Sequence, residues 1–305
     1  MLVLGHQNPD CDSLCSAIAL AALFNKIGRP ATPVLQGEPN PEAMFLLEQA
    51  GFATPEIRTS VADEEIFLVD FSDWGQGTAD MKKAKVRGIV DHHKLGDITT
   101  SEPLECWIWP VGCSATIVYN MYKFNNQTPD ADVAKLMMGA IISDTVNFQG
   151  PTTTDIDKVA AKELAEIAGV ADLAVFAETQ FEAKSDIASV PAAELILRDQ
   201  KVFEMAGDKL AIGQLELTSL ETAFSKKADM LAEMGQLQAD KGYHSTIVLL
   251  TDINKLDTTA LIISKDADKV AAALNSKVED HAFELPGVVS RKKQIIPFLQ
   301  EAFEA

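Results

Sequence analysis

The sequence predicts an α/β protein of two domains, the first built on a parallel sheet with flanking helices and the smaller second on a mixed sheet. Short apolar runs alternate with helical stretches in the first half, the order typical of parallel sheets. After about residue 190, β-like runs follow one another more closely. At 305 residues the chain is long enough for two cores. We therefore predict domains at residues 1–186 and 191–305, joined by a small, polar linker at about 184–190.

The first half begins with a short apolar run, Leu2–Leu4, which Gly5 stops and which predicts a buried strand. Ser13 can cap a helix running to about Ile27. Further strands are predicted at 31–35, 65–70 and 86–91, and further helices at 41–50, 129–148 and from Thr154 to Gly169.

The second half contains four β-like runs and several helical stretches. The predicted strands lie at 201–205, 210–217, 244–250 and 259–264, and the predicted helices begin at Pro191 and span 219–241, 265–274 and about 296–305.

Metal-binding side chains follow the first predicted strand. His6, Asp10 and Asp12 come within seven residues, on a loop where Pro9 disfavours helix. An imidazole and two carboxylates suit Mn²⁺, Co²⁺ or Zn²⁺ better than Ca²⁺. The alternative is a polar loop in which an aspartate only caps the helix.

Two later strands end in the same kind of residue. The run 65–70 ends at Asp70, and the run 86–91 is followed by His92 and His93. Parallel strands place their carboxyl ends along one edge of a sheet, so these side chains are expected to converge with His6. Asp144, at the end of an apolar helical stretch, is a further candidate ligand, although a lone aspartate there is more often a solvated turn residue.

The charge balance limits the class of partner. With 45 acidic and 26 basic residues the net charge is −19, which disfavours nucleic acid as a ligand. The densest basic cluster is SRKKQ, residues 290–294, containing Arg291 and Lys292; it is either an anion site or a solvated face. Four cysteines without CxxC spacing, no room for a signal peptide and apolar runs too short to span a bilayer predict a cytoplasmic protein without a membrane partner.

In this order, GHQNPDCDS, the strand ending at Asp70, VDHH, IISDT and SRKKQ resemble the family II inorganic pyrophosphatases of the DHH phosphoesterase superfamily. The resemblance implies that His6, Asp10 and Asp70 hold one metal. It implies that Asp12, Asp70, His92 and Asp144 hold a second, with Asp70 bridging. It also implies that the pyrophosphate and the product phosphate are bound, in the cleft between the domains, by His93, Lys201, Arg291 and Lys292.

The implied reaction is hydrolysis of inorganic pyrophosphate to two phosphates by a water or hydroxide bridging two Mn²⁺ or Co²⁺ ions per subunit. Mg²⁺ would be needed for activity and to complex the substrate. The resemblance also implies a homodimer formed through the N-terminal domain. One departure stands out, because Phe71 and Ser72 follow the bridging aspartate where family members usually have His-Asn.

Two alternatives remain open on sequence grounds. A DHH exonuclease or nucleotide phosphodiesterase would be expected to carry a glycine-rich GGGH-like sequence, which this chain lacks. A non-catalytic metal- or nucleotide-binding regulator would be expected to have lost ligands, yet all are present. A regulatory member with an inserted domain is disfavoured, because the stretch between His93 and Asp144 is too short to hold one.

Overall fold

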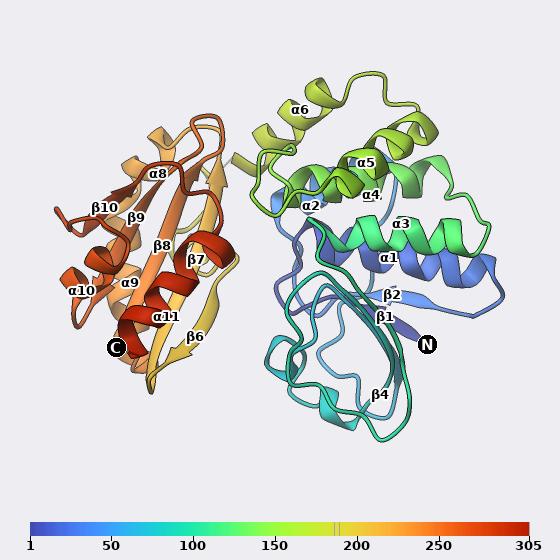
Figure 1. The fold of residues 1–305 in the computed structure, drawn as a ribbon, viewed down its shortest axis with the longest axis horizontal. Helices are drawn as coiled ribbons and strands as arrows, with labels where there is room; N and C mark the ends of the chain where they lie inside the picture. The colour runs from blue at the N-terminus through green and yellow to red at the C-terminus, as the bar shows by residue number, and fades with distance from the viewer. Residues whose placement is uncertain (186, 189, 305) are drawn as a thin grey trace. The chain divides into compact units, whose positions relative to one another are not determined.

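The computed structural model describes residues 1–185, 187–188 and 190–304. The chain divides into two compact units, Met1–Ala183 and Lys184–Ala305 (Figure 1). The predicted linker at 184–190 includes Asp186 and Ser189, which lie outside the described residues, as does Ala305 at the end of the last predicted helix. Each unit has its own sheet and core.

The first unit is built on a five-stranded parallel sheet. Its strands are β1 (Leu2–Leu4), β2 (Thr32–Val34), β3 (Glu65–Val69), β4 (Lys85–Asp91) and β5 (Glu105–Ile108), in the order β2-β1-β3-β4-β5. The chain leaves β1 in one direction to β2 and later returns on its other side to β3. Such a switch point opens a crevice at the carboxyl ends of the strands, where ligands bind in this class of sheet.

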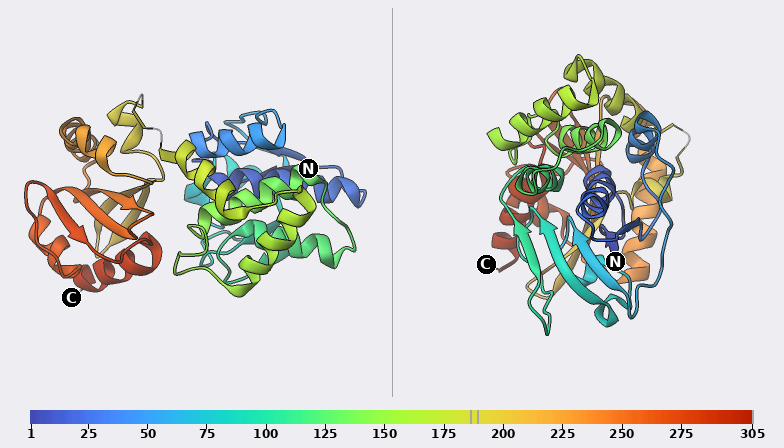
Figure 2. Two further views of the ribbon diagram at one scale, coloured as in Figure 1. Left: turned by 90° about the horizontal axis from the view of Figure 1, so that it is seen from above. Right: turned by 90° about the vertical axis from the view of Figure 1, so that its right-hand side faces the viewer.

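Helices cover one face of this sheet (Figure 2, right). They are α1 (Cys11–Lys26), α2 (Pro41–Ala50), α3 (Ser114–Phe124), α4 (Ala131–Asp144), α5 (Asp155–Ala168) and α6 (Leu173–Ser185). Helices α1 and α3 lie against the strands, α4 packs on α1, and α5 packs on α4. The other face is covered by less regular chain, including the short 3₁₀ turns Trp74–Gln76 and Met81–Lys83.

The second unit has a mixed five-stranded sheet. Its strands are β6 (Lys201–Met205), β7 (Asp208–Leu217), β8 (Ser245–Asp252), β9 (Asp257–Ser264) and β10 (Ala282–Leu285), in the order β10-β9-β8-β7-β6. Only β7 and β8 are parallel. One face packs against α10 (Ala267–Ala273) and α11 (Ile296–Glu304), and the other against α7 (Ala192–Leu195) and α9 (Lys227–Lys241).

The structure confirms the predicted α/β class and corrects several elements. The helix expected to begin after Ser13 begins at Cys11, because the Asp10 carboxylate accepts the Ser13 N–H and caps it. The helix expected over 129–148 is α4 and ends at Asp144, since residues 146–148 have positive φ. The helix expected over 219–241 is interrupted after α8 (Glu221–Ser225).

Four elements were not predicted: β5, α3, α6 and β10. The linker predicted from small, polar residues at 184–190 overlaps the end of α6, which reaches Ser185. Ile187, also within the predicted linker, is fully buried in the core of the second unit. Among the described helices, none combines the length and the apolar character needed to cross a membrane.

Candidate metal centre

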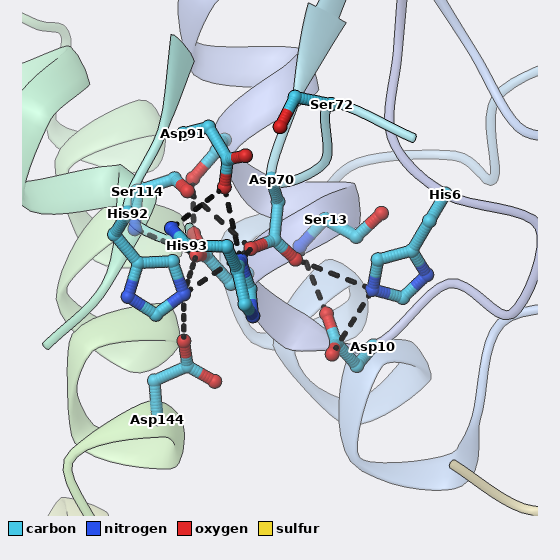
Figure 3. A network of polar contacts seen from close by, with 12 residues as sticks. His6, Asp10, Ser13, Asp70, Ser72, Asp91, His92, His93, Ser114 and Asp144 are labelled. Carbon is cyan, nitrogen blue, oxygen red and sulfur yellow. Dashed lines mark hydrogen bonds and ion pairs between the residues drawn. The ribbon is translucent and has the colours of Figure 1, made fainter. Parts of the chain in front are cut away.

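Three neighbouring strands of the first sheet each deliver a metal-binding side chain. His6 follows β1, Asp70 follows β3 and His92 follows β4, and the close-up in Figure 3 shows these side chains converging. The Asp70 N–H donates to the Val90 carbonyl at 2.8 Å, so the β3–β4 pairing continues into the site. Gly5 allows the chain after β1 to approach α1, since a Cβ there would lie 2.7 Å from the Ser13 carbonyl oxygen.

The first ligand group consists of His6, Asp10 and Asp70. His6 Nε2 lies 3.2 Å from Asp70 Oδ2 and 3.4 Å from Asp10 Oδ2. One ligating atom from each residue falls within a cluster no more than 4.8 Å across. Because Asp10 uses its other oxygen to cap α1, the start of this helix fixes its carboxylate beside the imidazole.

The second ligand group consists of Asp12, Asp70, His92 and Asp144. His92 Nε2 lies 3.3 Å from Asp70, 3.5 Å from Asp144 and 3.8 Å from Asp12. The His92 Nδ1–H donates to the Val111 carbonyl at 3.0 Å. A carbonyl can only accept, so this bond places the proton on Nδ1 and leaves the Nε2 lone pair directed at the acids.

Asp70 is the residue common to both groups. Its Oδ2 faces His6 and its Oδ1 faces His92, and the residue is 2% exposed. Its backbone has φ of 68°, a left-handed conformation that aspartate tolerates better than most residues. This conformation, at the end of β3, places the Asp70 carboxylate between the two groups.

The buried charges perturb each other strongly. Burial alone would lower the pKa of His6, but Asp10 and Asp70 raise it to about 10. Burial would raise the pKa of Asp70, but His6 and His92 hold it well below its usual range. Burial and the neighbouring Asp70 raise the pKa of Asp12 to about 7. The cluster therefore needs positive charge to remain ionised.

Divalent metal ions fit this requirement. The buried His6 Nε2 has no hydrogen-bond partner among the described residues, although two carboxylate oxygens lie near it. Mixed nitrogen and oxygen donors suit Mn²⁺ or Co²⁺. The Asp70 carboxylate faces both groups.

Two residues beside the ligands were not predicted as part of the site. Asp91 is fully buried, and its Oδ1 accepts both the backbone N–H and the Nδ1–H of His93 at 2.9 Å. The sequence signal that could have indicated Asp91 is its position directly before two histidines. Cys113 places its sulfur in a cluster with Asp12 and Asp144 less than 4.8 Å across, and its sequence context gave no indication of this.

The departure at Phe71–Ser72 has a structural explanation. Phe71 is fully buried in the apolar cluster that covers the face of the sheet opposite the helices. Ser72 Oγ accepts the Gly96 N–H at 2.9 Å, which ties the chain after Asp70 to the loop after His93. Neither side chain belongs to the two ligand groups.

The predicted cations lie in the second unit. The Arg291 guanidinium donates to the carbonyls of Asp199 and Ile212 and pairs with the Asp199 carboxylate at 3.0 Å. Ile212 is the β7 residue opposite Lys201 in β6, so Arg291 binds beside the start of β6. Lys292 is exposed in the turn Arg291–Ile295. The structure thus places the six predicted ligands and His93 in the first unit, and the three predicted substrate-binding cations in the second.

Both parts of the chain match domains of known proteins. Residues 1–141 match the N-terminal domain of the DHH family, and residues 178–302 match the DHHA2 domain. The probable manganese-dependent inorganic pyrophosphatase of Archaeoglobus fulgidus is 40% identical over 99% of this chain and 97% of its own length. The manganese-dependent inorganic pyrophosphatase of Bacillus subtilis is also 40% identical, over 99% of this chain and 98% of its own.

A solved structure gives the same result for the fold. The crystal structure of the putative family II inorganic pyrophosphatase of Methanococcus jannaschii superposes with a TM-score of 0.90 at 38% identity, covering 99% of both chains. Identity of this size over the full length, together with both domain matches, shows that the chain belongs to the family II, manganese-dependent inorganic pyrophosphatases of the DHH superfamily.

Proposed function

We propose that this protein hydrolyses inorganic pyrophosphate to two phosphates at a dinuclear centre formed by the two ligand groups. The observation that carries the proposal is the Asp70 carboxylate, whose two oxygens face His6 on one side and His92 on the other. The names of the relatives support the choice of substrate.

The residues divide into two sets of ligands. His6, Asp10 and Asp70 would hold one Mn²⁺ or Co²⁺ ion, and Asp12, Asp70, His92 and Asp144 would hold another, with Mg²⁺ complexing the substrate. When bound, two such ions offset the charge of pyrophosphate and lower the pKa of a water molecule toward neutrality.

The remaining side chains are proposed to bind the substrate. Asp91 Oδ1 accepts the Nδ1–H of His93, so a second proton on Nε2 would let the imidazolium donate to a phosphate oxygen. Lys201, Arg291 and Lys292 supply positive charge for the non-reacting oxygens and the leaving phosphate. For Arg291 this requires the guanidinium to exchange its bond with the Asp199 carboxylate for one with phosphate.

One assay separates this function from its alternatives. With Mn²⁺ and Mg²⁺ present, phosphate release is measured from pyrophosphate, and chromatography follows the conversion of a short oligonucleotide and of a cyclic dinucleotide to mononucleotides or a linear dinucleotide. We expect turnover of pyrophosphate alone. Turnover only of a nucleotide substrate would identify a DHH nuclease or phosphodiesterase, and binding of one of the three without turnover would identify a regulator.

The assembly and location are further parts of the proposal. We propose a homodimer formed through the first unit and a cytoplasmic location, as the family resemblance and the reduced-cysteine pattern predict. Sedimentation equilibrium of the purified protein tests the first, and a species of monomer mass at micromolar concentration would contradict it.

A further inference from the structure

We propose that Asp157 is a positioning residue for the second ligand group, acting through the segment 111–114. This proposal rests on the proposed dinuclear function. Asp157 lies in the first turn of α5, outside the residues matched to either domain of the family, and it belongs to neither ligand group.

The segment 111–114 contacts two of the second group's ligands. The Val111 carbonyl accepts the Nδ1–H of His92 at 3.0 Å, which sets the tautomer and the direction of Nε2. The Ser114 N–H donates to Asp12 Oδ2 at 2.6 Å, and the Ala115 N–H that follows donates to Asp12 Oδ1 at 3.0 Å. A displacement of this segment would therefore move an imidazole and a carboxylate together.

Asp157 anchors this segment from behind. Its carboxylate, which is fully buried, accepts the Gly112 N–H at 2.8 Å and the Thr116 hydroxyl at 2.7 Å. These donors lie 45 and 41 residues earlier in the chain, on either side of the start of α3. The carboxylate thus holds both ends of the turn that presents the Val111 carbonyl and the Ser114 amide.

Gly112 shows how closely the segment is packed. A Cβ at this position would lie 2.8 Å from Thr145 Cγ2 and 2.9 Å from Asp157 Oδ2. Thr145 directly follows Asp144, so the segment also abuts the end of the helix that carries this third ligand. The segment 111–114 is therefore packed between Asp157 and the chain segments that carry Asp12, His92 and Asp144.

Capping α5 does not explain these bonds by itself. Asp157 also accepts the N–H and hydroxyl of Thr154 in a capping box, and those contacts are sufficient to start the helix. The bonds to Gly112 and Thr116 leave the helix and reach the segment. The two roles can be separated, because Thr154→Ala removes the hydroxyl of the cap and leaves the Gly112 and Thr116 donors in place.

The experiment compares Mn²⁺ binding to metal-stripped full-length protein by isothermal titration calorimetry, with bound metal counted by elemental analysis. Asp157→Ala is expected to weaken one of the two Mn²⁺ sites roughly tenfold or more, the range for residues that orient ligands, and to spare the other. Asp157→Asn keeps one acceptor oxygen and is expected to restore part of the lost affinity. Thr154→Ala is the matched control and is expected to lower the urea midpoint while both affinities stay at the wild-type values.

Gly112→Ala perturbs the same segment while every donor and acceptor of the cap stays in place, and it keeps the test decisive if Asp157→Ala fails to fold. It is expected to weaken the same single site. Wild-type binding in Asp157→Ala or Gly112→Ala, or equal weakening of both sites, would overturn the proposal. These readouts do not depend on turnover, so absence of pyrophosphate hydrolysis by the wild type would contradict the proposed function and leave the positioning role to be decided by metal binding.

Discussion

Asp70 carries more of the proposed chemistry than any other side chain, because its two oxygens face different ligand groups. Asp70→Asn removes a negative charge that both ligand groups share. It also replaces one carboxylate oxygen by an amide nitrogen, which cannot bind a cation. We expect loss of metal from both sites and near-complete loss of pyrophosphate hydrolysis. Elemental analysis after desalting checks the first, and a variant that loses only one ion would contradict the shared role.

Phe71 shows how a residue next to a ligand can serve packing alone. Its ring is fully buried in an apolar cluster. Phe71→His would place an imidazole there without a partner, and we expect the free energy of unfolding to fall by about 1–3 kcal/mol. Phe71→Leu is the control, expected to cost less because it keeps the site apolar. Urea unfolding of both measures the difference, and tighter Mn²⁺ binding by Phe71→His would show that an imidazole reaches the metals instead.

The raised pKa of His6 predicts how metal binding depends on pH. With its pKa raised from 6.5 to about 10 in the folded protein, the His6 proton stabilises the metal-free protein fully below about pH 6.5, and this contribution is lost as the pH rises through about 10. A metal ion must displace that proton. Mn²⁺ affinity is therefore expected to rise between about pH 6 and about pH 9, with proton release visible as buffer-dependent calorimetric heat. Affinity that does not change across this range would contradict the protonated state.

At the scale of elements, helix ends and strand ends together build the site. Three adjacent strands supply His6, Asp70 and His92, while α1 starts at Asp10 and α4 ends at Asp144. Asp12 accepts the first N–H groups of α3, so one proposed ligand also caps a helix that begins about a hundred residues later in the chain. Ligand geometry and helix packing are therefore coupled in this unit.

Helix α6 is joined to the first unit by a buried amide. Gln180 Nε2 donates to Glu42 Oε1 at 2.8 Å and to the Gly139 carbonyl at 2.9 Å, linking α6 to α2 and α4. We expect Gln180→Ala to lower the free energy of unfolding by about 1–3 kcal/mol without changing the number of Mn²⁺ ions bound. Thr179→Ala, at an exposed neighbour on the same helix, is the control. Equal stabilities of the two variants would show that the amide does not anchor the helix.

At the scale of the whole molecule, we predict that both units are needed for turnover, because the proposed metal ligands lie in the first unit and three of the proposed substrate-binding residues in the second. Lys292 and Lys293 are adjacent and both exposed, which makes them a matched pair. Lys292→Ala is expected to raise KM for pyrophosphate several-fold with unchanged metal content, because the proposed cation contacts substrate and not metal. Lys293→Ala is expected to behave as wild type. An equal effect of both would indicate that only the net charge of this turn matters.

The sequence by itself determined the α/β class, the existence of a parallel first sheet and the candidate ligands. Apolar runs that stop at His6, Asp70 and His92 are local patterns, and parallel strands carry such ends to one edge whatever the details of packing. Strong local signals also fixed the ends of α2 and α5, where Asn40 or Thr154 begins the helix and a left-handed glycine ends it.

The tertiary structure alone decided which groups hold those ligands in place. Nothing local marks Cys113, the Val111 carbonyl or the bonds of Asp157 to Gly112 and Thr116, because in each case the two partners lie about 20 to 100 residues apart in the chain. Both β5 and α3 also escaped prediction; α3 contains three consecutive β-branched residues, 116–118, whose intrinsic helix propensity is low, and tertiary packing overrides that preference. Local sequence can place a ligand at the end of a strand, but the direction of its lone pair depends on contacts that only the folded chain brings together.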